Sequence, residues 1–492
     1  MNQMLDFTSQ LFEKELIPIA DRTEAIVRGG RHLFPLLPAA FEGVRQIGVI
    51  GWGPQGAAQA QNLRDSLAGS DIRVTVGLRD QSPSLAEARA AGFVEAEGTL
   101  GSMDQVLEES DMVLLLISDA AQAQHHDDIF GRLRPGTTLG LSHGFLLGHL
   151  DNVGASFPED IDVVAVCPKG MGKSVRALYE QGSAVNGAGI NASFAVHQDV
   201  TGKATDRALG WAVGLGAPYT FRTTLRSELV SDISGERAIL LGAVHGIVEC
   251  LYRSSRAEGV DAEQAFERSA ESITGPISRI ISKQGLLGVY KELDAAGQQT
   301  FAKAYAAAYP AGLEVFAEIY DEVASGNELR SIIMASERLD RFPLGNVEQG
   351  EMWEAGRTVR ARRRSGDTQL DPTTAGIYCG VMMGQVDQLI AHGHPYSEVA
   401  NESVIECVDS LNPYMHAHGV AYMIDNCSIT ARLGARKWAP RFDYLLEQIT
   451  LPLLREPERL DMSPFEDFGS HVVHDVLRTC AELRPSVDVY VE

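Results

Sequence analysis

The sequence has few positive charges and no long apolar run, and each shortage excludes a class of protein. Lysine and arginine number 42 against 66 aspartates and glutamates, which gives a formal net charge of −24. Such an excess repels phosphate backbones and anionic lipids, so binding to nucleic acid or to a membrane surface is not expected. Apolar runs such as Met112–Ile117 and Ala238–Val244 are far shorter than the roughly 18–20 residues of a membrane span.

Paired cysteines are also missing. None of the six cysteines forms a CxxC pair, which argues against a disulfide framework or a zinc ribbon and suits a reducing compartment. The first residues, MNQMLDFTSQLFEKEL, lack a basic segment followed by an apolar one and carry Asp6, Glu13 and Glu15, which transit peptides avoid. We expect a cytoplasmic protein, or an organellar one whose transit peptide has been removed.

The 492 residues suffice for two large domains or for two to four smaller ones. From residue 45 to about 225, amphipathic stretches alternate with the apolar runs RQIGVIGWG, DIRVTVGLR, SDMVLLLIS, GTTLGLSHG and IDVVAVCPK. Near-continuous apolar strands between helices predict a parallel sheet covered on both faces. We therefore predict an α/β protein with a Rossmann-type domain over residues 1–225 and a large all-helical domain over residues 226–492.

The C-terminal half has helical apolar spacing throughout and contains a weak internal repeat. GAVHGIV at 242–248 resembles GVMMGQV at 380–386, and each is followed by a similar helix, AEQAFERSAES or YSEVANESVIE. Two amphipathic helices can look this alike by chance, but the order of the parts favours a duplication with repeats over 226–365 and 366–492. Residues 340–375, rich in glycine and proline, are predicted to form a connection.

A dinucleotide-binding signature opens the N-terminal domain. The strand QIGVI runs into Gly51-Trp-Gly53-Pro-Gln55-Gly56 and then into a helix. Gly51 permits the turn, Gly53 lets the backbone approach a pyrophosphate, and Gly56 allows the helix to pack closely. The helix N-terminus supplies a positive end for the phosphates. In this context the glycines predict a nucleotide site, to which Gln55 also belongs.

The end of the second strand favours NADPH over NADH. An NAD-binding protein places an acidic residue there for the ribose 2′-hydroxyl, whereas this strand ends in Arg79 and is followed by Ser82 and Ser84. An arginine with two hydroxyls suits a 2′-phosphate, although Asp80 is a discordant neighbour. Further residues predicted to flank the cofactor follow the third apolar strand: Ser118, Asp119 and Gln122.

Four carboxylates in the helical half form two pairs. Asp232 and Glu236 stand four residues apart, as do Glu402 and Glu406, so each pair shares a helix face. Such pairs are common on solvated helices, but both of these lie beside apolar stripes and one falls in each half of the suspected repeat. Oxygen donors without paired cysteine or histidine indicate a hard cation, magnesium rather than zinc.

Two motifs were discounted and two residues retained. Residues 170–174, GMGKS, resemble the end of a phosphate loop, but the required leading glycine is Cys167. The basic run at 360–364 is expected to be a solvated surface. His143 and Lys169 end strands at the edge of the sheet where ligands bind in such folds, and a histidine there is as often structural as catalytic.

Long, ordered motifs resemble one family, ketol-acid reductoisomerase (acetohydroxy-acid isomeroreductase) in its long, plant-type form. The resemblance covers residues 25–490 and rests on IGVIGWGPQG, GLSHGFLLGHL, AVCPKGMG, NGAGINASFAVHQDV, SDISGERAILLGAVHGIVECL, NESVIECVDSLNP and DNCSITARLGARKWAPRFDY. The chain departs from plant members at Pro54, where serine is common, and at Asp80, where lysine is common.

The resemblance implies a reaction and a set of roles. 2-Acetolactate or 2-aceto-2-hydroxybutyrate is isomerised by alkyl migration and then reduced by NADPH, on the route to valine and isoleucine. Two Mg²⁺ ions are held by Asp232, Glu236, Glu402 and Glu406, with Asp232 bridging them. Ser428 binds the substrate carboxylate, His143 and Lys169 lie beside the metal-bound water and substrate, and Glu228 is an outer member. The family also implies a knotted path through the helical domain.

Two alternatives stay open at this point. A metal-free β-hydroxyacid dehydrogenase also joins a Rossmann domain to a helical one, but it needs a catalytic lysine in the helical half and no carboxylate set. A catalytically silent NADPH-binding sensor would bind the cofactor without turnover. The expected partners are a small 2-hydroxy-3-keto acid and a second copy of the chain, as a dimer or tetramer.

Overall fold

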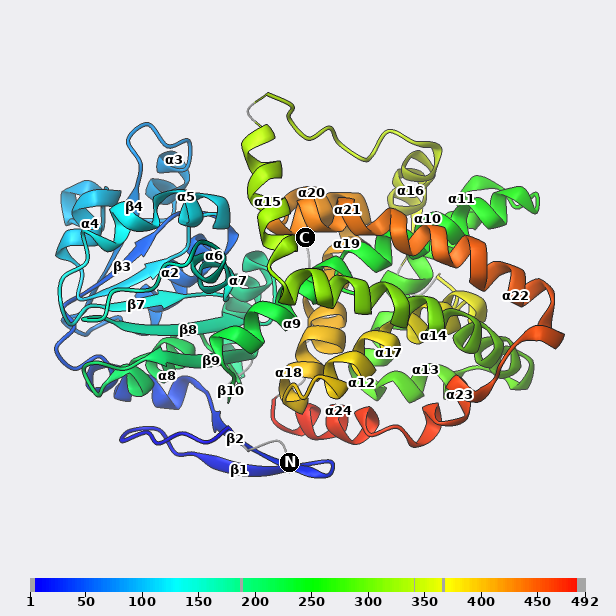
Figure 1. Cartoon of the computed structure of the whole chain (residues 1–492), viewed down its shortest axis with the longest axis horizontal. Helices are drawn as coiled ribbons and strands as arrows, with labels where there is room; N and C mark the ends of the chain where they lie inside the picture. Colours follow the sequence, from blue (N-terminus) through cyan, green and yellow to red (C-terminus); the bar gives the residue numbers. More distant parts are fainter. Residues whose placement is uncertain (1–4, 186–188, 340, 365–367, 485–492) are drawn as a thin grey trace. The chain divides into compact units, whose positions relative to one another are not determined.

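The chain folds into two compact units. The computed structural model describes residues 5–185, 189–339, 341–364 and 368–484. Among these residues, the N-terminal unit comprises those up to Val230 together with 480–484, and the helical unit comprises Ser231–Thr479. Both units are drawn in Figure 1. The predicted repeat boundary at 365/366 and the first three residues of NGAGINASFAVHQDV lie outside the described residues.

The N-terminal unit contains one ten-stranded sheet, in the order β1-β2-β10-β9-β8-β7-β6-β3-β4-β5. The strands are β1 (Glu15–Ile19), β2 (Arg22–Arg28), β3 (Gln46–Ile50), β4 (Arg73–Leu78), β5 (Leu100–Ser102), β6 (Met112–Leu115), β7 (Thr138–Leu141), β8 (Asp162–Pro168), β9 (Ala192–Gln198) and β10 (Tyr219–Arg222). All pairs from β5 to β8 are parallel. This parallel block confirms the predicted Rossmann-type sheet.

Helices cover both faces of the sheet because alternate residues of each strand are apolar on opposite sides. Met112 and Leu114 of β6 pack into one buried cluster, and Val113 and Leu115 into another. The first cluster includes side chains from α1, α2 and α8, and the second side chains from α4, α5 and α6. The bounds are α1 (Leu37–Ala40), α2 (Pro54–Ser66), α3 (Leu85–Ala90), α4 (Met103–Glu109), α5 (Asp119–Phe130), α6 (Phe145–Val153), α7 (Gly172–Gln181) and α8 (Ala204–Gly214).

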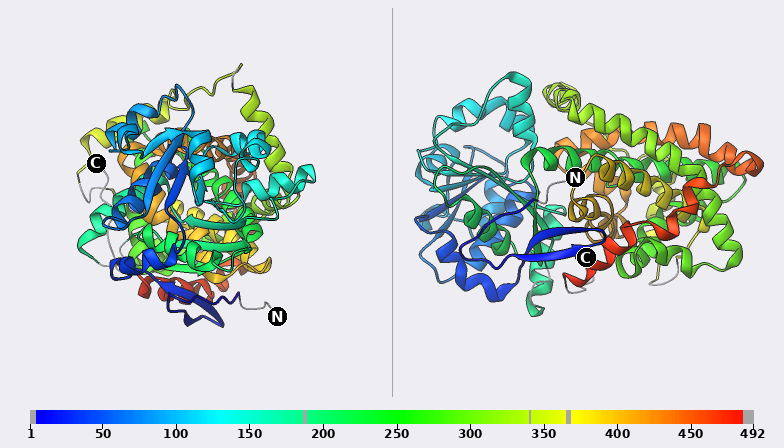
Figure 2. Two further views of the ribbon diagram at one scale, coloured as in Figure 1. Left: turned by 90° about the vertical axis from the view of Figure 1, so that its left-hand side faces the viewer. Right: turned by 60° about the horizontal axis from the view of Figure 1, so that its bottom comes forward.

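The sheet has an antiparallel extension that the sequence reading missed. β9 pairs antiparallel with β8, with an irregular register at Val163/Val164, and β10 then continues parallel to β9. The hairpin of β1 and β2, dark blue in Figure 2, joins the far edge antiparallel to β10. The apolar runs on which the prediction depended correspond to strands from β3 to β8, so they did not indicate β1, β2, β9 or β10.

The helical unit has no strand in its described residues, as predicted. α9 (Leu225–Arg237) runs into it from the N-terminal unit. The α-helices that follow are α10 (Gly242–Ala257), α11 (Ala262–Phe266), α12 (Ser278–Gln284), α13 (Leu286–Glu292), α14 (Ala295–Ala324), α15 (Asn327–Arg338), α16 (Glu351–Arg362), α17 (Pro372–Ala391), α18 (Tyr396–Ala400), α19 (Asn412–His418), α20 (Val420–Asn426), α21 (Ile429–Leu445), α22 (Leu451–Arg455), α23 (Ser463–Glu466) and α24 (Val473–Glu482).

Two series of elements in this unit follow the same order. In the first, α11 continues through the π-helices η4 (Glu267–Glu271) and η5 (Ile273–Ile277) into α12. In the second, α18 continues through the π-helices η6 (Asn401–Ile405) and η7 (Cys407–Leu411) into α19. Every start in the second series lies 134 positions after its counterpart, as with Ala262 and Tyr396.

The long helices that flank the two series pack on one another reciprocally. α10 packs along α21, and α14 packs along α17 (Figure 1). Glycines permit both approaches: a Cβ on Gly246 would lie 2.5 Å from the carbonyl oxygen of Ala439, and one on Gly384 would lie 2.7 Å from the backbone nitrogen of Leu313. The repeated GxxxG spacing therefore marks two close helix crossings.

The predicted connection at 340–375 is partly wrong, because it contains the twelve-residue helix α16. Arg360 and Arg362 belong to that helix, and Arg363, just after it, is largely enclosed and pairs with the buried Glu271 at 2.5 Å. The basic run is therefore not simply a solvated surface. The helix also has a buried side formed by Met352, Trp353 and Val359, which the glycines in this stretch made hard to recognise in the sequence.

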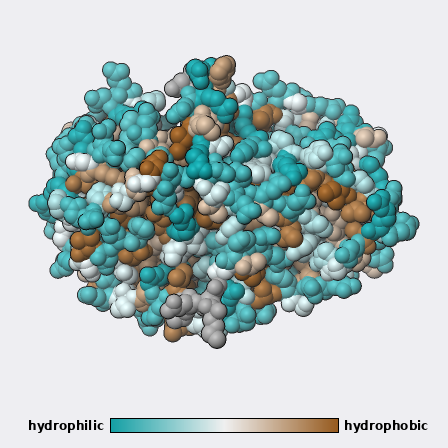
Figure 3. Space-filling model, in the orientation of Figure 1, coloured by the Kyte–Doolittle hydropathy of each residue, from teal (hydrophilic) through white to brown (hydrophobic). Residues whose placement is uncertain are grey.

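The face of the molecule drawn in Figure 3 carries mainly hydrophilic side chains, with apolar ones in small groups between them. All six cysteines are free thiols. Among the described helices, none has the length and apolar content needed to cross a membrane.

Candidate active site

The glycine-rich loop between β3 and α2 has the geometry of a dinucleotide cradle. Gly51 has φ of 110°, and a Cβ there would lie 2.6 Å from the carbonyl oxygen of Leu116. A Cβ on Gly56 would lie 2.5 Å from the carbonyl oxygen of Gly51, whereas one on Gly53 would meet open space. Pro54 is the first residue of α2, where a helix leaves its N–H unbonded anyway. The loop therefore keeps an open concave side for a pyrophosphate.

The segment after β8 closes against this loop. The side-chain amide of Gln55 donates to the carbonyl oxygen of Gly170 at 2.8 Å. A Cβ on Gly172 would lie only 1.8 Å from the carbonyl oxygen of Pro54, so only glycine fits. GMGKS is thus no phosphate loop of its own, but its glycines let α7 begin beside the cradle. The sequence reading discounted the motif without finding this role.

Arg79 lines a cavity of about 530 Å³ at the ends of β4 and β5. Asp80 and Gln81 lie on the same wall. Arg79 and Asp80 are exposed, and no ion pair of either is recorded in the described part of the chain. Ser82 and Ser84 follow in a turn in which the Ser84 N–H donates to the Ser82 hydroxyl. Arg79 therefore faces the cavity, whereas neither serine is among the residues that line it.

His143 and Asp119 form a hydrogen-bonded pair at the strand ends. The Phe145 N–H donates to Nδ1 of His143 at 3.2 Å, so the proton of the neutral imidazole sits on Nε2. Nε2 donates to Oδ1 of Asp119, which is buried in the first turn of α5, at 2.8 Å. Asp119, predicted as a cofactor residue, therefore orients the histidine.

The neighbours of Asp119 differ in exposure. Ser118 is exposed at the N-terminus of α5. The Gln122 amide donates to the carbonyl oxygens of Leu115 and Ile117, which anchors the helix to the end of β6. These contacts explain the position of Gln122 without a cofactor.

Lys169 is buried and bonded to a glutamate. Its Nζ lies 2.7 and 2.8 Å from the two carboxylate oxygens of Glu228, and both residues are at most 2% exposed. The Ser193 hydroxyl of β9 donates to the same carboxylate at 2.8 Å. Breaking such a pair from one side costs about 3–5 kcal/mol because the other charge stays buried. No pattern in the sequence indicated that β9 contributes a side chain here.

Two carboxylates meet where α9 crosses η6. Oxygens of Asp232 and Glu402 lie within 4.8 Å of one another, and Glu228, one turn before Asp232 on α9, offers an oxygen within the same distance of Asp232. Gly235 makes the crossing possible, because a Cβ there would lie 3.1 Å from the carbonyl oxygen of Glu402. The DISGE motif, residues 232–236, lies at the end of α9, which begins at Leu225.

Gln385 of α17 holds this crossing together. Its Oε1 accepts the Ile239 N–H at 3.2 Å, and its Nε2 donates to the carbonyl oxygen of Glu402 and the hydroxyl of Ser403, both at 3.0 Å. η6 is a π-helix, a form that occurs mostly in single turns at functional sites. Gln385 was not predicted, although a glutamine within the apolar stripe of α17 was a possible signal.

The second residue of the DISGE pair is oriented by its neighbour. Arg237 is fully buried and donates to Oε2 of Glu236 at 2.8 Å and to Glu328 at 3.0 Å. Lys437 also pairs with Glu328. Burial raises the pKa of Glu328, but attraction to Arg237 and Lys437 outweighs it and holds that pKa below its usual range.

Glu236 and Glu406 share a neighbour, Cys427. Burial first, and then the negative charges of Glu236 and Glu406, raise the pKa of that thiol. Ser428 follows as the N-cap of α21: its Oγ accepts the Ala431 N–H at 3.0 Å, and the residue is exposed. A 17-residue helix presents a positive end there, which suits an anion.

The residues fit a magnesium site in their chemistry. Asp232, Glu236, Glu402 and Glu406 offer carboxylate oxygens alone, the ligands that Mg²⁺ prefers. Asp232 and Glu236 are half-buried and Glu402 is fully buried, so like charges are gathered where water screens them poorly. A divalent cation would relieve that repulsion.

A Rossmann-type unit with a nucleotide cradle, joined to a helical unit with clustered carboxylates, defines an NAD(P)-dependent oxidoreductase that also has a cation site. The acetohydroxy acid isomeroreductase NADPH-binding domain matches residues 43–220, and the ketol-acid reductoisomerase C-terminal domain matches residues 225–365. The chain belongs to the ketol-acid reductoisomerase family and is an NADP-dependent oxidoreductase of branched-chain amino acid biosynthesis. This membership decides against both alternatives left open by the sequence.

Relatives match over nearly the whole chain. The chloroplastic ketol-acid reductoisomerases of Spinacia oleracea and Pisum sativum are each 55% identical, over 99% of this chain and 83% and 85% of their own. A probable mitochondrial ketol-acid reductoisomerase of Schizosaccharomyces pombe is 34% identical over 64% of this chain and 77% of its own. The solved structure of an NADH-preferring ketol-acid reductoisomerase from an uncultured archaeon shares the fold: 22% identity, TM-score 0.55, over 65% of this chain and 95% of that one.

Proposed function

We propose that residues 1–225 bind NADPH and residues 226–492 hold two Mg²⁺ ions and the substrate, and that the chain converts 2-acetolactate or 2-aceto-2-hydroxybutyrate to the 2,3-dihydroxy acid. The observation that carries this proposal is the approach of Asp232 and Glu402 from two helices to within 4.8 Å. It supports a cation site in the same chain as the nucleotide cradle.

NADPH rather than NADH is the proposed cofactor of this chain. Arg79, Ser82 and Ser84 would contact the 2′-phosphate, Gly51–Gly56 would receive the pyrophosphate, and Ser118, Asp119 and Gln122 would flank the nucleotide. Asp80 is exposed beside Arg79, so it can turn toward water.

The cofactor assignment is tested by Arg79→Ala. We expect KM for NADPH to rise at least about tenfold, the equivalent of ~1.4 kcal/mol, with little change for NADH. Arg89→Ala is the control, because Arg89 lines the same cavity but pairs with Glu95 at 2.6 Å. Equal effects of Arg79→Ala on both cofactors would refute phosphate recognition by Arg79.

The metal ligands are proposed to be Asp232, Glu236, Glu402 and Glu406, with Asp232 shared between the two ions. When bound, the ions acidify the substrate hydroxyl and polarise its carbonyl, and NADPH supplies the hydride. The chain holds the geometry: Gln385 fixes the Glu402 backbone and Arg237 fixes the Glu236 carboxylate.

Three polar side chains are proposed to bind the substrate. The Ser428 hydroxyl at the N-terminus of α21 would bind its carboxylate. His143, with its proton on Nε2 and oriented by Asp119, and Lys169, held by Glu228, would place polar hydrogens beside it. Glu228 is proposed as an outer partner of the metal site.

NADPH oxidation, followed by absorbance with 2-acetolactate in the presence and absence of Mg²⁺, tests the proposal directly. Asp232→Asn should abolish isomerisation and overall turnover while the Kd for NADPH stays unchanged. Glu258→Gln, which removes an exposed carboxylate of the helical unit, is the control and should keep full activity. Isomerisation that survives in Asp232→Asn would refute the metal role of Asp232.

We also propose that the helical domain is a duplication with repeats over 226–365 and 366–492. The constant offset of 134 positions supports it, and so do reciprocal contacts. Asn412 donates to Ser278, its own counterpart, at 2.8 Å, as residues on a twofold axis do. The knotted path implied by the family stays a prediction.

Two further properties are extended to this chain as proposals. The spinach and pea relatives are chloroplastic by name, and we propose an organellar location here too. A homo-oligomer, dimer or tetramer, is the proposed assembly. Light scattering on a gel-filtration column measures the assembly, and a fluorescent fusion expressed in the source cell reports the compartment.

A further inference from the structure

Helix α2, which follows the nucleotide cradle, buries a stripe of polar side chains. Gln59, Asn62 and Ser66 are 0%, 0% and 7% exposed. Their spacing puts them on one side of the helix, where a core would normally take apolar residues. A buried amide costs free energy unless its donors and acceptors are bonded, so each of these side chains calls for an explanation.

Gln59 bonds at both ends of its amide. Its Oε1 accepts the indole N–H of Trp211 at 3.0 Å, and its Nε2 lies 3.0 Å from Oε1 of Gln55 and 2.8 Å from the hydroxyl of Ser142. An indole N–H can only donate, so Trp211 fixes which end of Gln59 is the oxygen. The same argument then fixes Gln55, whose Oε1 accepts from Gln59 and whose Nε2 donates to Gly170.

These bonds make a directional chain from Trp211 through Gln59 and Gln55 to Gly170. The segments that it joins all carry proposed site residues. Gln55 lies in the first turn of α2, directly after the loop between β3 and α2, Ser142 precedes His143, and Gly170 follows Lys169. The ring of Trp211 also packs under β7, because a Cβ on Gly140 would lie 2.7 Å from it.

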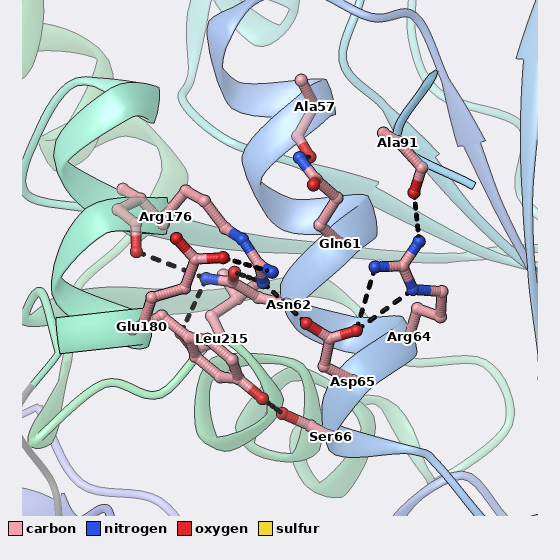
Figure 4. A network of polar contacts seen from close by, with 12 residues as sticks. Ala57, Gln61, Asn62, Arg64, Asp65, Ser66, Ala91, Arg176, Glu180 and Leu215 are labelled. Carbon is pink, nitrogen blue, oxygen red and sulfur yellow. Dashed lines mark hydrogen bonds and ion pairs between the residues drawn. The ribbon is translucent and has the colours of Figure 1, made fainter. Parts of the chain in front are cut away.

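The other two members of the stripe contact no such segment. Asn62 donates to the carbonyl oxygens of Val175 and Leu215 and accepts from Arg176, which also pairs with Asp65 and Glu180 (Figure 4). Ser66 donates to the carbonyl oxygen of Gly214 and bonds the Tyr179 hydroxyl. Both therefore tie α2 to α7 and to the end of α8, away from the strand ends.

We propose that Gln59 is a positioning residue that holds the glycine-rich loop, the Ser142–His143 strand end and the Lys169–Gly170 strand end in one fixed register for NADPH and substrate. Gln59 would act through Gln55 and Ser142 rather than by contact with the ligands. The inference rests on the proposed NADPH role of the Gly51–Gly56 loop.

The test is Gln59→Met in the full-length protein, since methionine keeps the length of the side chain and removes all three hydrogen bonds. We expect the Kd for NADPH, measured by fluorescence titration, to rise about tenfold and kcat to fall by a similar factor. Ser66→Ala is the matched control: it removes buried hydrogen bonds from the same helix and should lower the unfolding temperature with less than about twofold change in Kd or kcat.

Trp211→Phe provides the readout that a merely structural role would not give. It removes the donor that orients Gln59, together with the outer part of the ring that lies against Gly140. It should shift Kd in the same direction as Gln59→Met, and because the two variants lose one shared hydrogen bond, the double variant should show less than the sum of the two effects. Fully additive effects, or a folded Gln59→Met with wild-type Kd and kcat, would overturn the proposal. If Gln59→Met does not fold, an unchanged Kd in Trp211→Phe overturns it. If the wild-type protein does not bind NADPH, the cofactor assignment itself is refuted.

Discussion

The two matching series of the helical unit, residues 262–294 and 396–428, share a scaffold and differ in chemistry. Both run through an α-helix, two π-helices and an α-helix, and both turn at a glycine with positive φ, Gly285 at 74° and Gly419 at 110°. Both end at an N-cap whose side chain accepts the N–H three residues on, Asp294 in the first and Ser428 in the second.

The two glutamates proposed as metal ligands in the second series have no acidic match in the first. At the positions of Glu402 and Glu406, the first series has Arg268 and Ser272. The second series also has a buried pair, His394 with Glu398 at 2.7 Å, which Tyr320 extends by a hydrogen bond to the histidine. The first has Val260 and Gln264 at those two positions. The shared backbone arrangement, including the π-helices, therefore does not by itself form the proposed metal site. The proposed site depends on a few side chains that the first series lacks.

The largest expected effect comes from equivalent substitutions in the two series. Glu402→Gln should lower turnover more than about 100-fold and weaken Mg²⁺ binding, because even outer partners of metal ligands are worth about 10–100-fold. Arg268→Gln, at the equivalent exposed position, should change neither. Steady-state turnover and a Mn²⁺ titration followed by electron paramagnetic resonance measure both quantities. Comparable losses in the two variants would contradict the assignment of the site to the second series.

A smaller effect is expected one step from the ligands. Gln385→Leu removes the bonds to Glu402, Ser403 and Ile239, so the metal affinity and turnover should fall about 10-fold to 100-fold while NADPH binding stays unchanged. Gln388→Leu, on the same helix and half-buried, is the control. The same metal titration and NADPH fluorescence distinguish the outcomes; an equal loss of NADPH affinity would indicate general damage to the fold instead.

Where the two series agree, equal effects are expected. Gly246→Ala and Gly384→Ala each place a methyl group against the backbone of a facing helix, so each should destabilise the protein by about 1–3 kcal/mol. Thermal unfolding of the two variants measures this. Gly259→Ala tests backbone strain instead of close packing. The φ of Gly259 is 88°, which is strained for any residue with a side chain, although no neighbouring atom would contact the added Cβ. A shift for one crossing glycine and none for the other would break the reciprocal packing argument.

The sequence predicted the parallel core of the sheet and the nucleotide cradle because both depend on local signals. Apolar strands of fixed length and glycines at fixed spacing determine β3, the turn at Gly51 and the start of α2. The acidic pairs were found for the same reason, since a four-residue spacing is visible without a fold. Their mutual approach was implied only by the family resemblance, because it depends on Gly235 and Gln385, which are far apart in the chain.

The contacts that the sequence could not reveal are those between distant partners. Glu228 was named by the resemblance, but its pairing with Lys169 and Ser193 spans 59 and 35 positions, and Gln59, which was not named, bonds Ser142 and Trp211 across 83 and 152. No periodicity carries such contacts. The prediction that residues 340–375 form a connection failed at α16 for a local reason. Glycine and arginine in this stretch suggested a connection, but the segment forms a helix because its apolar side is buried.

The smallest expected effect is a pH dependence at His416, whose counterpart is Ser282. Burial first, and then Arg363, Arg279 and Arg360, lower the pKa of His416 to about 3 from 6.5, although Glu271 lies 3.6 Å away. Below about pH 6.5 the unfolded chain gains a proton that the folded chain refuses, so stability falls as the pH drops toward 3, by up to ~1.4 kcal/mol per pH unit.

His416→Gln keeps a polar side chain beside Thr274 and removes this titration. The urea midpoint of the variant should therefore fall less between about pH 7 and about pH 5 than that of the parent, by the equivalent of ~2 kcal/mol at most. Ser282→Ala, at the equivalent position, removes a hydrogen bond to Asp409 and should lower the midpoint equally at both pH values. If the urea midpoint of His416→Gln falls with pH as steeply as that of the parent, His416 does not cause the loss of stability. That loss would then come from another histidine with a lowered pKa, such as His149 or His474.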